Sequence, residues 1–276
     1  MTDFNRLPAV LVPYIDAIRA TEKPVVEMVL TAADTLSRTE SHVGGTPYLP
    51  LTETYPVDSN GIPLNLLIQV NFADMPPLAD YPRKGILQIY HGGDDLYGAD
   101  FDNLQEQKDF RILYFPDVTE DPALLHQDFS ALTAAKADGD YYSPVTGQYR
   151  ISFVPSVQYI STGDTAFGRT ILNCADLYDF EDEHKGEDFY EEWVEPYNEH
   201  FPGEGHRLGG YPAFTQTDPR EYNNELKPCV LLLQLDSGSE GVDIMWGDCG
   251  IGNFFIHPDD LKNADFSRVA YNWDCS

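Results

Sequence analysis

The stretch WGDCGIGNFFI, at positions 246–256, joins two apolar runs through a loop with three glycines in six residues. Glycine adopts positive φ and allows the backbone to approach other groups closely, so this loop is suited to a tight and irregular path. Residues 241–246 alternate between apolar and polar side chains as a half-buried strand does, and residues 253–256 predict a second strand that stops before Pro258. We therefore expect a hairpin with an elaborate tip here.

Segments close to this stretch recur earlier in the chain, which indicates an internal repeat. A Gly-Gly-x-Pro turn occurs at 44–47 and again at 209–212. The apolar run at 63–71 recurs at 228–236 in the same ungapped register, which places Gln234 on Gln69. The sequence thus predicts that one unit, a Gly-Gly-x-Pro turn followed by a buried strand ending in Gln, is present twice.

Two further predicted strands extend the repeated unit, and their two copies are separated by fewer residues along the chain. Residues 241–246 match 85–90, which places Trp246 on Tyr90. Residues 254–259 match 112–117. The order of the segments is kept, and the connecting loops are expected to be shorter in the second copy.

These patterns predict an α+β, β-rich fold with an internally duplicated, mostly antiparallel β core. We expect a single domain over residues 1–276 with repeats at about 40–120 and 205–262, because neither repeat has enough strands to cover its own apolar face. Apolar residues at helical spacing predict an N-terminal helix over 4–20 and a few peripheral helices, at 123–137 and 187–201, in an insert between the repeats.

Charge and cysteine content limit the classes of function. The chain has 46 acidic and 17 basic residues, which give a formal net charge of −29. Such a charge repels nucleic acid and anionic membranes and speeds encounter with cationic partners. The alternative interpretation is that the charge only keeps the protein soluble. None of the four cysteines forms a Cys-x-x-Cys pair, so no zinc or redox motif is present. With no signal-peptide pattern and no apolar run of membrane-spanning length, we expect a cytoplasmic protein with free thiols.

The loop at 94–103 has the carboxylate density that a calcium site needs, although it lacks the order of an EF-hand. Its candidate ligands are Asp94, Asp95, Asp100 and Asp102. The alternative interpretation is a solvated loop of Asx-turns. The glycines at 247–252 similarly allow an anion-binding nest, but Asp248 would repel phosphate, so a structural loop is favoured.

Polar and aromatic residues at strand ends are the candidate binding residues. Gln69 and Gln234 lie inside apolar runs and must find hydrogen-bond partners, either by bracing the turn of their own repeat or by lining a groove between the repeats. The other candidates are Tyr48, Tyr90, Tyr97, Trp246, Asp248 and Asn253. The seven histidines are scattered and no Gly-x-Ser-x-Gly motif is present, so no catalytic constellation is predicted.

Several motifs together resemble the bacterial YwqG-like family, itself a domain of unknown function. They are HVGGTPYLP at 42–50, LIQVN at 67–71, YGADFD at 97–102, FRILYF at 110–115, and the 246–256 stretch with YNWDC at 271–275. The chain is also distantly similar to the eukaryotic programmed-cell-death-protein-2 group, whose resemblance implies a duplicated unit and a chaperone role toward a basic ribosomal protein. That group carries a cysteine-rich zinc module, which this sequence lacks. The bacterial relatives also allow a toxin-immunity role.

The predicted function is therefore a non-enzymatic, acidic protein-binding module for a basic partner, chaperone-like or toxin-immunity in kind, that binds neither nucleic acid nor membrane. The alternative is a small-ligand or divalent-metal-binding protein, or an enzyme, that uses the loops at 94–103 and 246–253.

Overall fold

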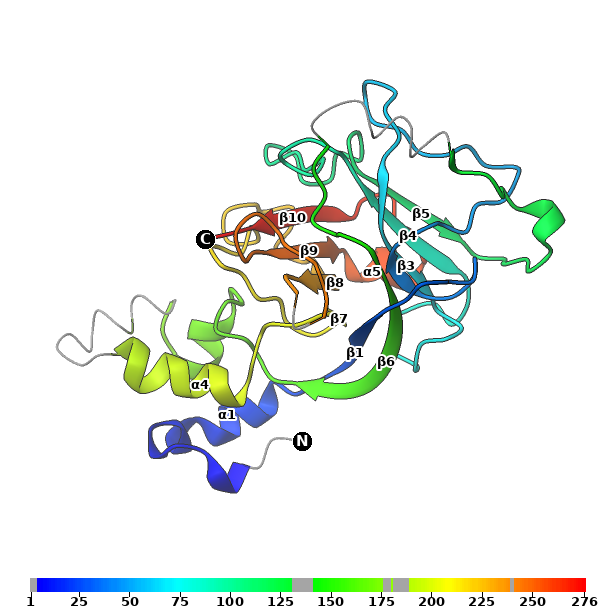
Figure 1. Cartoon of the computed structure of the whole chain (residues 1–276). Coiled ribbons are helices and arrows are strands. Elements are labelled where there is room, and N and C mark those ends of the chain that lie inside the picture. Colours follow the sequence, from blue (N-terminus) through cyan, green and yellow to red (C-terminus); the bar gives the residue numbers. More distant parts are fainter. Residues whose placement is uncertain (1–3, 131–140, 176–179, 181–188, 239–240) are drawn as a thin grey trace.

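The computed structural model describes residues 4–130, 141–175, 180, 189–238 and 241–276. These residues form one ten-stranded sheet with the spatial order β10-β9-β8-β7-β1-β6-β2-β3-β4-β5, in which all neighbouring strands are antiparallel (Figure 1). The strands are β1 (Lys23–Ala32), β2 (His42–Gly44), β3 (Asn65–Asn71), β4 (Ile86–His91), β5 (Arg111–Phe115), β6 (Gln148–Gln158), β7 (Arg207–Leu208), β8 (Val230–Asp236), β9 (Ile251–Ile256) and β10 (Ala270–Asp274). The predicted β-rich, mostly antiparallel core is confirmed.

Short helices lie outside the sheet. They are the 3-10 segments η1 (Phe4–Arg6), η2 (Ala9–Tyr14) and η3 (Pro122–Leu124), the π-helical segments η4 (Gly168–Leu172) and η5 (Tyr190–Val194), and the α-helices α1 (Ile15–Ala20), α4 (Glu195–His200) and α5 (Pro258–Lys262). Figure 1 shows α1 and α4 together at the lower left, away from β3, β4 and β5. No described helix combines the length and apolarity needed to cross a membrane.

The predicted continuous helix over 4–20 is wrong, because the segment is broken into η1, η2 and α1. Pro8 precedes η2 and Pro13 lies inside it, and a residue without a backbone N–H favours short, tight turns over a long α-helix. The helix predicted at 187–201 is present in its described part as η5 followed by α4. Of the segment predicted as a helix at 123–137, residues 131–137 lie outside the described residues.

β1 and β6 are the longest strands and lie in the middle of the sheet. β1 pairs with β6 on one side and with β7 on the other, whereas β6 also pairs with β2. β1, which precedes β2 in the chain, thus extends the β7–β10 part of the sheet. β6, which precedes β7 in the chain, extends the β2–β5 part. The two halves of the chain exchange their first strands.

Strand pairing in the two halves recurs in one register. The matching pairs are His42–Gln69 with Arg207–Gln234, Gln69–Gln88 with Gln234–Asn253, and the register irregularity Leu66/Ile68 with Leu231/Leu233. All of these matches share the constant offset that relates position 44 to position 209. β9 therefore stands to β8 as β4 stands to β3. Below, residues related by this offset are called corresponding residues.

The strand predicted at 241–246, and with it the hairpin expected at 246–256, is wrong. Residues 241–246 belong to the connection between β8 and β9, where only Ile244 makes a β-bridge, with Val145. The alternation is real, since Ile244 and Trp246 are buried between exposed neighbours, but it arises from a loop folded onto the core. Trp246 consequently corresponds to Tyr81 in the connection between β3 and β4, and not to Tyr90. The third strand of this half is β10, and not residues 254–259.

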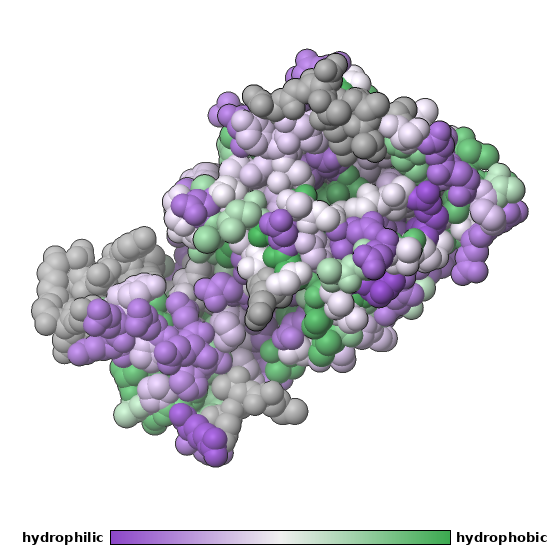
Figure 2. Space-filling view, in the orientation of Figure 1, coloured by the Kyte–Doolittle hydropathy of each residue, from purple (hydrophilic) through white to green (hydrophobic). Residues whose placement is uncertain are grey.

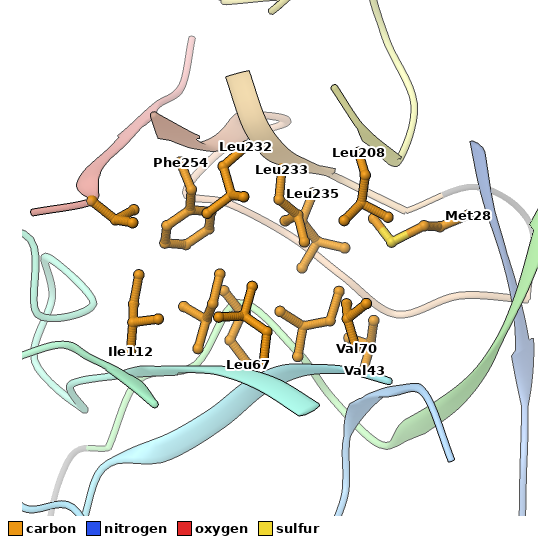
Figure 3. Packing of buried hydrophobic residues seen from close by; sticks show 14 of the residues in the cluster. Met28, Val43, Leu67, Val70, Ile112, Leu208, Leu232, Leu233, Leu235 and Phe254 are labelled. Atoms are coloured by element: carbon orange, nitrogen blue, oxygen red, sulfur yellow. The ribbon is translucent and has the colours of Figure 1, made fainter. Parts of the chain in front are cut away.

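The main core lies between the two parts of the curled sheet. Figure 3 shows Val43, Leu67, Val70 and Ile112 on one side, facing residues of the other side. The labelled residues of the other side are Met28, Leu208, Leu232, Leu233, Leu235 and Phe254. The Tyr81 hydroxyl reaches across and donates to the carbonyl oxygen of Leu232 at 2.6 Å. Both halves therefore bury their apolar faces in the same core.

Candidate functional site

Gln69 is fully enclosed and holds the first Gly-Gly-x-Pro turn against its strand. Its Oε1 accepts the backbone N–H of Tyr48 at 2.8 Å, and its Nε2 donates to the carbonyl oxygens of Arg38 and Glu40, each at 2.9 Å. Gln88 adds to this group, because its Nε2 donates to Gln69 Oε1 at 2.7 Å. All the polar atoms of the Gln69 amide are thereby satisfied inside the protein.

Gln234 forms the corresponding set of contacts in the second half. Its Oε1 accepts from Ala213 N at 2.8 Å, and its Nε2 donates to the carbonyl oxygens of Gly203 and Gly205 at 2.9 and 2.8 Å. Asn253 Nδ2 donates to Ala213 O at 2.8 Å. The sequence left open whether the two glutamines brace their turns or line a groove, and these contacts are bracing contacts.

Three aromatic candidates lie in the interior. Tyr48, Tyr90 and Trp246 are buried, and Tyr90 donates its hydroxyl hydrogen to Gln88 Oε1 at 2.9 Å. Tyr97 is half-buried, and Asp248 is exposed. Of the candidate binding residues named from the sequence, only Tyr97 and Asp248 are therefore placed to meet a partner in this conformation.

Two histidines next to the braces are held in the neutral form, of which His42 is fully buried and His206 is half-buried. Burial lowers the pKa of His42 to about 4, and burial together with the neighbouring Arg207 lowers the pKa of His206 to about 4. His206 Nδ1 accepts the backbone N–H of Asp236 at 3.0 Å, which requires an unprotonated nitrogen. Burial raises the pKa of the Asp236 carboxyl. Protonation of this group on acidification therefore favours the folded state and opposes the effect of the histidines.

We expect these histidines to make folding sensitive to acid. In the unfolded chain a histidine titrates near 6.5, so this contribution to stability is complete above pH 6.5 and is lost as the pH falls toward 4, on the order of 2–3 kcal/mol for each site. Urea unfolding at several pH values should show a smaller acid loss for His206→Asn, which keeps an acceptor for Asp236 N, than for the wild type. His200→Asn is the control, and equal pH slopes for His206→Asn and the wild type would contradict the assignment.

An exposed patch combines apolar and acidic side chains from three distant segments, and we call it the aromatic–acidic face. Trp273 on β10 donates its indole N–H to Leu96 O at 2.8 Å, and its ring lies 4.9 Å from that of Tyr97 and 6.2 Å from that of Phe101. Tyr97 also packs edge-on against Trp246 at 5.7 Å. The two loops singled out in the sequence, at 94–103 and 246–253, thus lie side by side.

The outer layer of this face is partly apolar and is built from segments without basic residues. Leu96 and Phe101 are 43% and 48% exposed. Its exposed carboxylates are Asp94, Asp95, Asp100, Asp102 and Asp248. The segments 92–104, 243–251 and 269–276 contain no Lys or Arg. In the view of Figure 2, hydrophobic residues of the molecular surface are interspersed with hydrophilic ones.

The four aspartates proposed for calcium do not converge on one point. Asp94 accepts the backbone N–H of Gly98 at 2.6 Å, and Asp100 accepts those of Asp102 and Asn103 at 3.0 Å. Within the described ranges, no three Asp, Glu, His or Cys side chains are gathered so that they could hold a metal ion. The contact of Asp100 with Asp102 N is that of an Asx-turn, whereas Asp94 accepts a backbone N–H four residues on, so both carboxylates are engaged within the loop itself.

A cleft of about 490 Å³ opens beside the second brace, and we call it the insert cleft. One wall is formed by residues 161–168 with part of η5 and α4, and the other by residues 213–218. Gly203 and Ala213, which Gln234 holds in place, both line it. Nearby, Arg220 pairs with Asp164 at 2.9 Å and with Asp218 at 2.5 Å.

Residues 41–275 match the family model of a domain of unknown function, DUF1963. The chain belongs to the DUF1963 family. No curated protein matches the chain. The DUF1963 region contains both braces, the aromatic–acidic face and the insert cleft, whereas β1 and the N-terminal helices precede it.

Sequence reasoning about this DUF1963 chain missed the residues that give the aromatic–acidic face its outer surface. Leu96, Phe101 and Trp273 were not among the candidates, although the Asp-rich surroundings of Phe101 and the absence of basic residues near Trp273 were a usable signal. Their proximity depends on β10 lying beside the loop at 94–103, which the expected register excluded.

Proposed function

We propose that this protein is a non-enzymatic, acidic protein-binding module that holds a basic polypeptide on its aromatic–acidic face. The observation that carries the proposal is the exposure of Leu96 and Phe101, which lie beside the Trp273 ring, among the exposed carboxylates of the same loop. A chain with a formal net charge of −29 attracts cationic partners over its whole surface, and this face adds apolar side chains that bind at short range.

The chemistry of the face suits lysine and arginine side chains. A cation over the ring of Trp273, Tyr97 or Phe101 gains about 0.5–2 kcal/mol, depending on how far it is desolvated. The alkyl stem of the same side chain covers apolar surface such as Leu96, while its charged group meets the surrounding aspartates. Affinity is thus expected to come from a few aromatic anchors, with the carboxylates setting the association rate and the choice of partner.

The finer sequence resemblances support this proposal without fixing the partner. The YwqG-like resemblance, and the more distant one to the programmed-cell-death-protein-2 group, suggest either a chaperone for a basic protein or an immunity protein for a basic toxin. We interpret the constant offset between corresponding pairs as the result of an internal duplication. A cytoplasmic setting is part of the same proposal, because the four cysteines are free thiols.

Affinity capture with the tagged protein is expected to recover a basic polypeptide in about 0.1 M salt and to release it in about 1 M salt, where the Debye length falls from about 10 Å to about 3 Å. The variant Leu96→Ser/Phe101→Ser should bind the recovered partner at least about tenfold more weakly, since two anchors worth about 1.4 kcal/mol or more in total are lost. Quantitative mass spectrometry followed by titration of the purified partner measures both effects.

Ile62→Ser/Val154→Ser is the matched control, because these side chains are 44% and 42% exposed in other parts of the surface. A partner that is retained in high salt, or that binds both double variants equally, would refute the role of the aromatic–acidic face.

A further inference from the structure

The first half of the chain binds a segment of its own backbone at the place that corresponds to the insert cleft. The backbone N–H of His126 donates to Leu49 O, and the N–H of Leu51 donates to Leu124 O, both at 2.9 Å. Leu125 packs on Tyr48 and Ile86 in a small apolar cluster. Residues 117–127 thus run along the turn that Gln69 braces, with Leu125 as their apolar anchor.

The corresponding positions in the second half line an open space. The residues Tyr48, Leu49, Leu51, Lys84 and Ile86 correspond to Ala213, Phe214, Gln216, Cys249 and Ile251, all of which line the insert cleft. The correspondence holds here because Tyr48 N and Ala213 N donate to the matching atoms of Gln69 and Gln234. The cleft therefore lies where the first half places a tyrosine ring and a backbone segment.

Ala213 leaves room that Tyr48 fills in the first half, and one backbone acceptor there has no partner. Leu49 O accepts from His126, whereas the corresponding Phe214 O accepts no hydrogen bond within the described part of the chain. Gln216 N is already bonded to Asp274 Oδ2 at 2.8 Å. An incoming segment would therefore make one backbone hydrogen bond where residues 124–126 make two.

The charge of the cleft differs from that of its counterpart. Among the described residues its lining contains five carboxylates and no Lys, Arg or His. Arg220 pairs with two of these, Asp164 and Asp218. Among the described residues, Glu204, Glu221 and Asp236 form no ion pair, and Asp236 accepts the backbone N–H of Gly205 at 2.6 Å. A segment that enters the cleft meets an excess of negative charge.

We propose that the insert cleft is a second binding site, which takes an extended basic segment of the partner with an apolar side chain at the place that Tyr48 and Leu125 occupy in the first half. The proposal rests on the proposed function in taking the partner to be basic. The partner's backbone donates to Phe214 O, its apolar side chain lies over Ala213 and Ile251, and its lysine or arginine side chains reach Glu204 and Glu221.

The test uses a peptide based on the chain's own segment. A fluorescein-labelled peptide with the sequence of residues 117–127, carrying Asp117→Lys, Glu120→Lys and Asp121→Lys, is titrated with the full-length protein and followed by anisotropy. We expect saturable binding, at least tenfold tighter than that of the unchanged acidic peptide. Ala213→Tyr, which fills the cleft as Tyr48 fills its counterpart, should weaken binding at least tenfold without lowering the melting temperature.

A second variant keeps the test valid if Ala213→Tyr does not fold. Glu204→Lys/Glu221→Lys changes two acidic side chains of the cleft and should weaken binding at least tenfold, whereas Glu53→Lys/Glu120→Lys, with the same change in net charge, should not. Absence of peptide binding, or equal binding by all variants, would overturn the proposal. Binding that is lost in Leu96→Ser/Phe101→Ser but kept in Ala213→Tyr would overturn the cleft as well, yet would leave the proposed function of the aromatic–acidic face intact.

Discussion

Fragments 1–130 and 141–276, produced separately, are expected to be unfolded alone and to form a folded complex when mixed. The first fragment contains β1 but not β6, and β2 lies beside β6 in the sheet. The second contains β6 but not β1, beside which β7 lies. Each fragment would also expose its side of the shared core, since Leu67 and Leu232 are fully buried in the same cluster.

Far-UV circular dichroism and size-exclusion chromatography of each fragment and of the mixture measure this effect. The mixture should elute as a one-to-one complex and unfold in one transition, as expected for one cooperative core. As a control, a truncation that keeps every strand pair in one chain, made by deleting residues 1–20, should keep the cooperative folding of the sheet, with a lower stability because the buried Leu11 and Ile18 are lost. A second fragment that folds alone, with a cooperative transition, would show that the exchange of first strands is not needed for stability.

The sequence predicted the strands that are bounded by clear turn residues. Gln69 and Gln234 were matched in the correct register because a polar residue in an apolar run is a strong marker, and its bracing contacts follow from the need to satisfy a buried amide. The strand exchange was not predictable in this way. Alternation of side chains shows which residues of β1 face inward, but it carries no information about which strand lies next to β1.

The errors have identifiable causes. Residues 241–246 have the period of a strand because Ile244 and Trp246 are buried, yet the backbone continues as a loop. Because of that false strand, β9 was matched to β5 and not to β4. As a result, β10 and Trp273 were not placed beside the loop at 94–103. The aromatic–acidic face joins residues that lie far apart in the chain, such as Phe101 and Trp273. Local patterns predict such a face only when the strand order is already known.

Gln234→Leu is expected to destabilise the protein by about 2–4 kcal/mol, because it leaves two backbone groups without a hydrogen bond at about 1–3 kcal/mol each, partly offset by the burial of an apolar side chain. Those groups are Ala213 N and Gly205 O, whereas Gly203 O keeps the Arg207 guanidinium as a donor at 2.7 Å. Gln69→Leu should cost at least as much, since Gln88 Nε2 loses an acceptor in addition. Chemical unfolding at pH 7.5 measures both, with the exposed Gln127→Leu as the matched control; a loss below about 1 kcal/mol would contradict the bracing role.

Gln234→Glu separates the loss of hydrogen bonds from the loss of shape. A carboxylate at this place keeps the acceptor for Ala213 N but faces the carbonyl oxygens of Gly203 and Gly205, to which it has no hydrogen to donate. We therefore expect Gln234→Glu to be at least as destabilising as Gln234→Leu near neutral pH. In acid it should recover part of its stability, because the carboxyl group gains a proton that it donates to one of the two carbonyls.

Gly203 and Ala213 also line the insert cleft, so the Gln234 variants should lose peptide binding together with the brace. Gln69→Leu, kept folded at low temperature, should still bind the peptide in the insert cleft.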